Sequence, residues 1–144
     1  MDVELGQLVF DGRESVWLAP SKSYVLVRIF TNNNTMVGYS SWPAVTLSLG
    51  NFAFSGMAFD GGYYLYLAPH LAQAPVRVDT RTGDMTGYTS WPSGLQTFGQ
   101  GLFGGALWDG RNIWLVPSRC NYLVRFDTAT GTLHGESNWP TGQR

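Results

Sequence analysis

Three tryptophans, each followed by proline, stand at regular intervals and carry side chains that can bind a ring-shaped ligand. Trp42, Trp91 and Trp139 lie in "SSWP", "TSWP" and "SNWP". An exposed indole can stack on the apolar face of a sugar, and repeated sites on one molecule increase the overall affinity. The same rings could instead pack inside the fold, since a glycine four residues before each one suits close packing. Both interpretations stay open.

Three arginines recur at the same spacing as the tryptophans. Arg28, Arg77 and Arg125 could bind hydroxyls or a carboxylate, because the guanidinium is a planar fork of donors. Arg77 and Arg125 are each followed two residues later by an aspartate, on the same face of an extended strand. Each arginine and its aspartate are therefore also expected to form an ion pair that links parts of the fold.

His70 and Asn121 complete the candidate ligand-binding residues, because they lie in variable loops of the kind that carry binding sites on rigid scaffolds. Enzyme chemistry has little support. The two histidines, His70 and His134, occupy non-equivalent positions, and no carboxylate pair recurs with acid/base geometry. Cys120 is the only cysteine, which excludes an internal disulfide. We expect no catalytic residue, no metal and no cofactor.

The elements that position these residues form three repeats of 48 or 49 residues. Each unit contains Asp-Gly, an apolar strand that ends in proline, Val-Arg and Trp-Pro. In the second unit we expect four strands, over residues 55–61, 64–67, 75–79 and 85–91. Asp-Gly favours a hairpin turn with positive φ at both residues. The repeat length is typical of propeller blades.

The stretch "YLYL" is apolar on both of its faces, with Leu65 and Leu67 opposite Tyr66. A strand of this kind is covered on both faces, as the strands of a blade between two other blades are. The sequence therefore predicts an all-β protein, a β-propeller with three four-stranded antiparallel blades. We expect one domain over residues 1–144, with blades at about 3–43, 53–92 and 103–140.

The repeat resembles the FDGR-type β-propeller repeats of bacterial and phage-associated proteins. The matching stretches are "FDGR" at 10–13, "WDGRNIWLVP" at 108–117 and "VRFDT" at 124–128, and the resemblance covers residues 8–140. The chain departs from the pattern at Phe30, where the other repeats have an acid, and at Gly62, where they have arginine. The resemblance implies a fold, without a particular activity or set of catalytic residues.

Three blades cannot close a ring, because propellers have about four to eight. We expect head-to-tail association of the third blade of one copy with the first blade of another. The chain is then its own partner. A homodimer with six blades is favoured, and a homotrimer with nine is the alternative.

Composition narrows the other partners. The formal net charge is −1, charged residues are 13% of the chain and Lys22 is its only lysine, which argues against binding nucleic acid. No apolar run approaches the roughly 20 residues of a membrane span. We expect a non-enzymatic, lectin-like module that binds glycans on its loop-rich rim. The alternatives are a structural or decorating component of a larger assembly such as a phage particle, with a virion surface as partner, or an engineered or excised propeller fragment. The compartment stays open, an extracellular or virion-associated location included.

Overall fold

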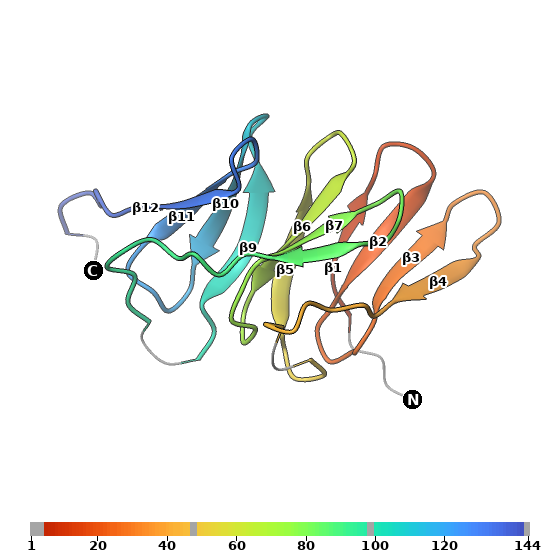
Figure 1. The fold of residues 1–144 in the computed structure, drawn as a ribbon, viewed down its shortest axis with the longest axis horizontal. Helices are drawn as coiled ribbons and strands as arrows, with labels where there is room; N and C mark the ends of the chain where they lie inside the picture. The colour runs from red at the N-terminus through yellow and green to blue at the C-terminus, as the bar shows by residue number, and fades with distance from the viewer. Residues whose placement is uncertain (1–4, 47–48, 98–99, 143–144) are drawn as a thin grey trace.

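The computed structural model describes residues 5–46, 49–97 and 100–142, and it contains three four-stranded antiparallel sheets (Figure 1). Residues 3 and 4 of the first expected blade lie outside this part of the chain. The strands of the first blade are β1 (Leu5–Phe10), β2 (Ser15–Pro20), β3 (Leu26–Phe30) and β4 (Met36–Tyr39). Those of the second are β5 (Phe54–Phe59), β6 (Tyr64–Pro69), β7 (Val76–Asp79) and β8 (Met85–Gly87). Those of the third are β9 (Phe103–Trp108), β10 (Asn112–Pro117), β11 (Leu123–Asp127) and β12 (Thr132–Glu136).

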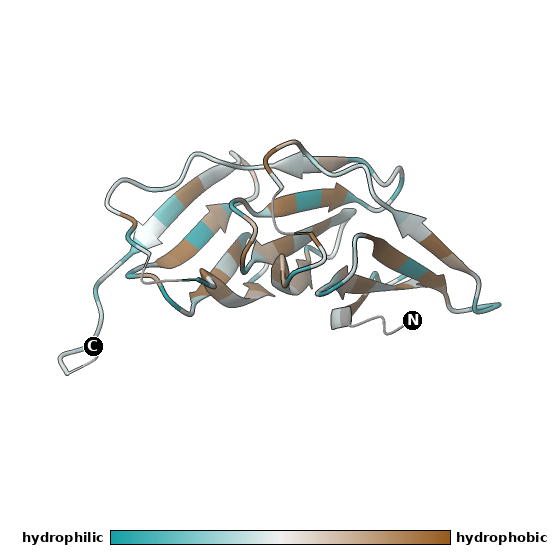
Figure 2. Ribbon diagram, turned by 90° about the horizontal axis from the view of Figure 1, so that it is seen from below, coloured by the Kyte–Doolittle hydropathy of each residue, from teal (hydrophilic) through white to brown (hydrophobic). Residues whose placement is uncertain are grey.

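Each sheet is a meander in which every strand pairs with the next one in the chain. The first strands of the blades, β1, β5 and β9, contact one another in turn, as the inner strands of a propeller do. The prediction of an all-β propeller with three four-stranded blades is confirmed. Figure 2 shows apolar bands on the strands of all three blades.

The core consists of two layers, one on each side of the second blade. Leu65 and Leu67 face the first blade and pack in a cluster with Trp17. Tyr66 faces the third blade and packs with Ile113 and Phe126. The expected opposition of leucine and tyrosine faces on β6 is confirmed, because a blade on each side covers this strand.

The fourth strand of the second blade is shorter than expected. It ends at Gly87 instead of Trp91. The chain leaves the sheet there because the Trp91 side chain bonds outside the ladder, with its indole N–H donating to the Gln73 carbonyl at 3.0 Å. The three Trp-Pro pairs therefore lie in the linkers between blades and in the segment after β12.

The Asp-Gly turns differ from the expected geometry. Positive φ occurs at Gly12, Gly61 and Gly110, whereas the aspartates before them keep negative φ. Each aspartate instead accepts hydrogen bonds from backbone N–H groups on the far side of its turn. The aspartate carboxylate thus accepts the hydrogen bonds of backbone N–H groups in the turn. A side chain organises this turn, instead of the backbone pairing of a two-residue hairpin.

Candidate functional site

The meander places its connections at two opposite rims. The turn rim contains the short turns between first and second strands and between third and fourth strands. The loop rim contains the loops between second and third strands, at 21–25, 70–75 and 118–122, and the interblade linkers at 40–53 and 88–102. The candidate residues divide between the strands and the loop rim.

The tryptophans join each blade to the next. The indole N–H groups of Trp42, Trp91 and Trp139 donate to backbone carbonyls 18 residues earlier, at 2.8, 3.0 and 2.9 Å. The Trp42 ring stacks on Phe54 and the Trp91 ring stacks on Phe103, with centroids 5.4 and 5.6 Å apart. These two rings therefore use one face and the N–H within the chain. Trp139 has no such ring partner among the described residues and is 45% exposed.

The arginines lie on the blade faces. Arg28 reaches the second blade, where its Nη1 donates to the Thr80 carbonyl at 3.3 Å. It also forms an ion pair with Glu14 at 3.3 Å. Arg77 lies 4.4 Å from the centroid of the Tyr64 ring, and Arg125 pairs with Glu136 at 3.4 Å. The arginines thus contribute to packing within and between blades.

The predicted ion pairs between each arginine and the aspartate two residues later are wrong. Asp79 instead binds Arg81 at 2.8 Å, and Asp127 lies 3.8 Å from Arg111. Both partners are turn residues, which reach the strand-end carboxylates more directly than a strand arginine does. The Arg81 guanidinium holds the pKa of Asp79 below its usual range.

Asn121 fastens a linker to the loop rim. Its side-chain oxygen accepts from the Gln96 backbone N–H at 2.7 Å, and its amide nitrogen donates to the Gly94 carbonyl at 3.0 Å. Both ends of this amide are therefore engaged within the chain.

His70 holds the junction where the linkers enter the second and third blades. Its backbone N–H donates to Ala53 and its carbonyl accepts from Leu102, both at 2.8 Å. The imidazole Nδ1 lies 3.3 Å from the Phe103 carbonyl, which can only accept, so Nδ1 carries the proton. Nε2 has no hydrogen-bond partner among the described residues. The ring fits closely against Gly101, where a Cβ would come within 2.6 Å of His70 Cε1.

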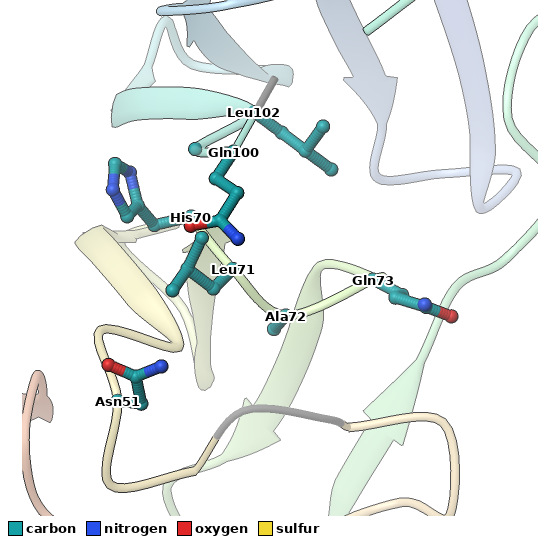
Figure 3. A pocket seen from close by; sticks show the side chains of 8 residues that line it. Asn51, His70, Leu71, Ala72, Gln73, Gln100 and Leu102 are labelled. Carbon is teal, nitrogen blue, oxygen red and sulfur yellow. The ribbon is translucent and has the colours of Figure 1, made fainter.

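Two adjoining cavities beside His70 form what we call the rim pocket. Their volumes are about 270 and 450 Å³, and both are lined by Asn51, His70, Leu71 and Gln100. The larger one also includes Phe52, Ser118 and Arg119. Figure 3 shows how Asn51 and Gln100, from two different linkers, approach the His70–Gln73 loop. The rim pocket therefore combines residues from both linkers with residues from two loops.

Of the predicted site residues, only His70 lines the rim pocket. Trp91 and Arg28 line two separate cavities, the first beside Ala44 and Val45 and the second beside Asp11 and Tyr63. Sequence reasoning missed the other polar residues of the pocket, among them Asn51, Gln100 and Arg119. A signal was present for Arg119, because it holds the repeat position of Lys22, which makes the loop rim basic at two places.

Neither a cluster of metal-ligating side chains nor a membrane-spanning helix is found among the described residues. Among the described residues, no three His, Cys, Asp or Glu side chains gather closely enough to hold a metal ion. The described residues also form no helix long and apolar enough to cross a membrane.

Comparisons with known proteins give structural neighbours only. No family model and no curated protein sequence matches this chain. Virginiamycin B lyase from Staphylococcus aureus matches 98% of it at 18% identity, with a TM-score of 0.66. A streptogramin B lyase matches 88% at 16% identity (TM-score 0.61), and U3-55K matches 93% at 8% identity (TM-score 0.66). The chain spans only 43%, 38% and 39% of the lengths of these three structures.

The neighbours correct the functional expectation. Two of them are lyases, and none of the three is named as a lectin or a virion component. The prediction of a lectin-like glycan-binding module, with a decorating role in an assembly such as a phage particle as its alternative, is therefore wrong. At identities between 8% and 18% the likeness shows the fold alone, a β-propeller.

Proposed function

We infer that this chain is a building block of a closed propeller, and that two copies join head to tail to form a six-bladed ring. One observation carries the proposal. The two outer faces of the chain are apolar at the same repeat positions at which the blade faces inside it pack against each other.

The first end face is the side of the first blade that points away from the second. Leu8, Phe10 and Met36 on this face are 58%, 54% and 66% exposed. The residues at the same repeat positions in the second blade, Met57, Phe59 and Met85, pack against the first blade. The rest of the face consists of apolar residues that are partly exposed, namely Val16, Leu18, Val27 and Ile29.

The second end face is the side of the third blade that points away from the second. Leu107 and Val116 on this face are 62% and 50% exposed. They correspond to Ala58 and Ala68 of the second blade, which are buried against the third blade. Monomers rarely expose large contiguous apolar patches. Contact between the two end faces would cover both patches, at repeat positions that already pack together twice in the chain.

The residue types at the outer ends of the chain support the same pairing. Both internal interfaces place a tyrosine of one blade over a turn glycine of the next, as Tyr39 over Gly83 and Tyr88 over Gly131. At the two outer ends the corresponding residues are Glu136 and Asn34. Asn34 keeps the positive φ of the glycines, at 60°. Tyrosine and glycine are thus replaced together by a carboxylate and an amide, which can hydrogen-bond across an interface.

An arginine contact can also be repeated. Arg28 donates to the Thr80 carbonyl across the first interface. At the same repeat positions, the second end face offers Arg125 and the first blade offers Thr31. Head-to-tail contact would bring the Arg125 guanidinium of one copy to the Thr31 carbonyl of the other.

The mass in solution tests the proposal directly. Light scattering at micromolar concentration should give twice the mass of the 15.9 kDa chain. Leu107→Asp would place a carboxylate in the apolar interface and should give a folded monomer. A wild-type chain that stays monomeric would overturn the proposal, and three times the chain mass would replace the six-bladed ring by a nine-bladed one.

The proposal concerns how the chain assembles and assigns it no reaction. The two lyase neighbours suggest a direct check for a reaction. Incubation of the chain with virginiamycin B, followed by mass spectrometry, should leave the compound unchanged. Turnover would show that the likeness extends from the fold to the chemistry.

A further inference from the structure

We propose that the rim pocket binds a small organic carboxylate. The pocket lies within a single chain, so this inference stands independently of the proposed ring.

The described acidic residues of the chain gather at one of its two rims. Among the described acidic residues, all except Glu136 lie at or beside the turn rim, namely Asp11, Glu14, Asp60, Asp79, Asp84, Asp109 and Asp127. Among the described residues, the loops and linkers of the loop rim contain no aspartate or glutamate, but include Lys22 and Arg119. The loop rim is therefore the side of the molecule that attracts an anion.

Hydrogen-bond donors line the pocket itself. Arg119 is exposed, and its guanidinium has no partner among the described residues, so its fork can take a carboxylate. Gln100 and Asn51 add amide groups, and Ser118 adds a hydroxyl. His70 Nε2, with Nδ1 held by the Phe103 carbonyl, can accept a hydrogen bond from a ligand hydroxyl.

An apolar wall accompanies these donors. Leu71 and Phe52 line the same cavity. Phe52 has a φ of 51°, a left-handed conformation that is unfavourable for a bulky residue. Gly101 holds the same repeat position in the next linker and also has positive φ. Phe52, at a position that suits glycine, thus provides an aromatic ring. The Lys22 Nζ lies 4.8 Å from the centroid of this ring.

These features define the ligand class. The cavity of about 450 Å³ falls in the range of roughly 300–1,000 Å³ that is typical of small-molecule sites. A lining that combines cationic and amide donors with apolar side chains suits a carboxylate with a short apolar body. Inorganic phosphate would satisfy the donors but leave Leu71 and Phe52 without a contact.

The probe is benzoate, with benzamide as an uncharged molecule of the same shape. In ¹H–¹⁵N NMR titrations, benzoate should shift the amide signals of His70, Leu71, Gln100 and Arg119. Benzamide should bind at least about tenfold more weakly, which corresponds to about 1.4 kcal/mol for the lost charge. Inorganic phosphate should bind these residues more weakly than benzoate.

Two arginine variants separate a site from general attraction of anions. Arg119→Gln should weaken benzoate binding about tenfold or more, whereas Arg111→Gln removes the same charge from the turn rim and should leave it unchanged. Equal effects of the two variants, equal binding of benzoate and benzamide, or tighter binding of phosphate would each overturn the carboxylate assignment. The monomeric Leu107→Asp variant should bind benzoate like the wild type. Ring formation and ligand binding can therefore fail separately.

Discussion

Truncation of Leu107 is the most informative test of the end faces. Leu107 lies on β9 beside Trp114, and 62% of it is exposed in the single chain. In the ring this area would be covered by the first blade of the second copy. Leu107→Ala removes most of the side chain and should leave the isolated chain nearly as stable as before, because the leucine contributes little to the existing core.

The magnitude follows from the exposed fraction. Full burial of a leucine contributes about 1.5–3 kcal/mol, so burial of the remaining 62% contributes about 1–2 kcal/mol. A two-copy ring contains the interface twice, so the substitution acts twice and should cost about 2–4 kcal/mol of dimerisation free energy. At about 1.4 kcal/mol per factor of ten, the dissociation constant should rise roughly 30- to 700-fold.

Sedimentation over a dilution series would measure the two dissociation constants. Val37→Thr is the matched control. Val37 is 37% exposed and lies on the face of the first blade that points toward the second blade, outside both end faces. The second repeat has Thr86 at this position. The control should dimerise like the wild type. An unchanged dissociation constant for Leu107→Ala would refute the placement of the second end face in the interface, whatever the oligomeric state.

Three further predictions concern stability and can be checked by urea unfolding. Burial alone would raise the pKa of Asp11, but hydrogen bonds from backbone N–H groups and the Trp17 indole lower it overall. Because the folded-state pKa is below the unfolded value of about 3.9, the contribution of Asp11 is complete above that pH and is lost on further acidification. Asp11→Asn should therefore destabilise the chain at pH 7 and flatten its loss of stability below about pH 4; an unchanged acid profile would contradict this. Gly83→Ala should cost about 2–4 kcal/mol, because φ is 81° and the new Cβ would meet the Tyr39 ring, whereas Gly104→Ala, with open space around it, should cost under about 1 kcal/mol. In a monomeric background, Trp91→Ala should cost about 2–4 kcal/mol and Trp139→Ala clearly less, because only Trp91 stacks on the next blade; equal costs would show that the stacking contributes nothing.

Much of the fold could be predicted because repetition makes each local pattern count three times. The two apolar faces of the strand around Tyr66 indicated a blade between two blades, and the structure has that arrangement. The side-chain contacts were less predictable. The partner of Asp79 depends on how the turn brings Arg81 back to the strand end, and spacing along one strand favoured Arg77 instead. The rim pocket joins residues as far apart as Asn51 and Arg119, at positions that differ between repeats, so periodicity gave no signal for it.

The tryptophans that join one blade to the next make the three blades unequal in how readily they unfold locally. Trp42 anchors the first blade to β5 and Trp91 anchors the second to β9, so the second blade is held from both sides and the other two from one side only. In a linear array with nearest-neighbour coupling, the terminal units fray first. The slowest amide hydrogen exchange of the single chain is therefore expected in β6, between the two cores. Closure of a ring would give every blade two neighbours and would raise protection in β2 and β10 toward the value of β6.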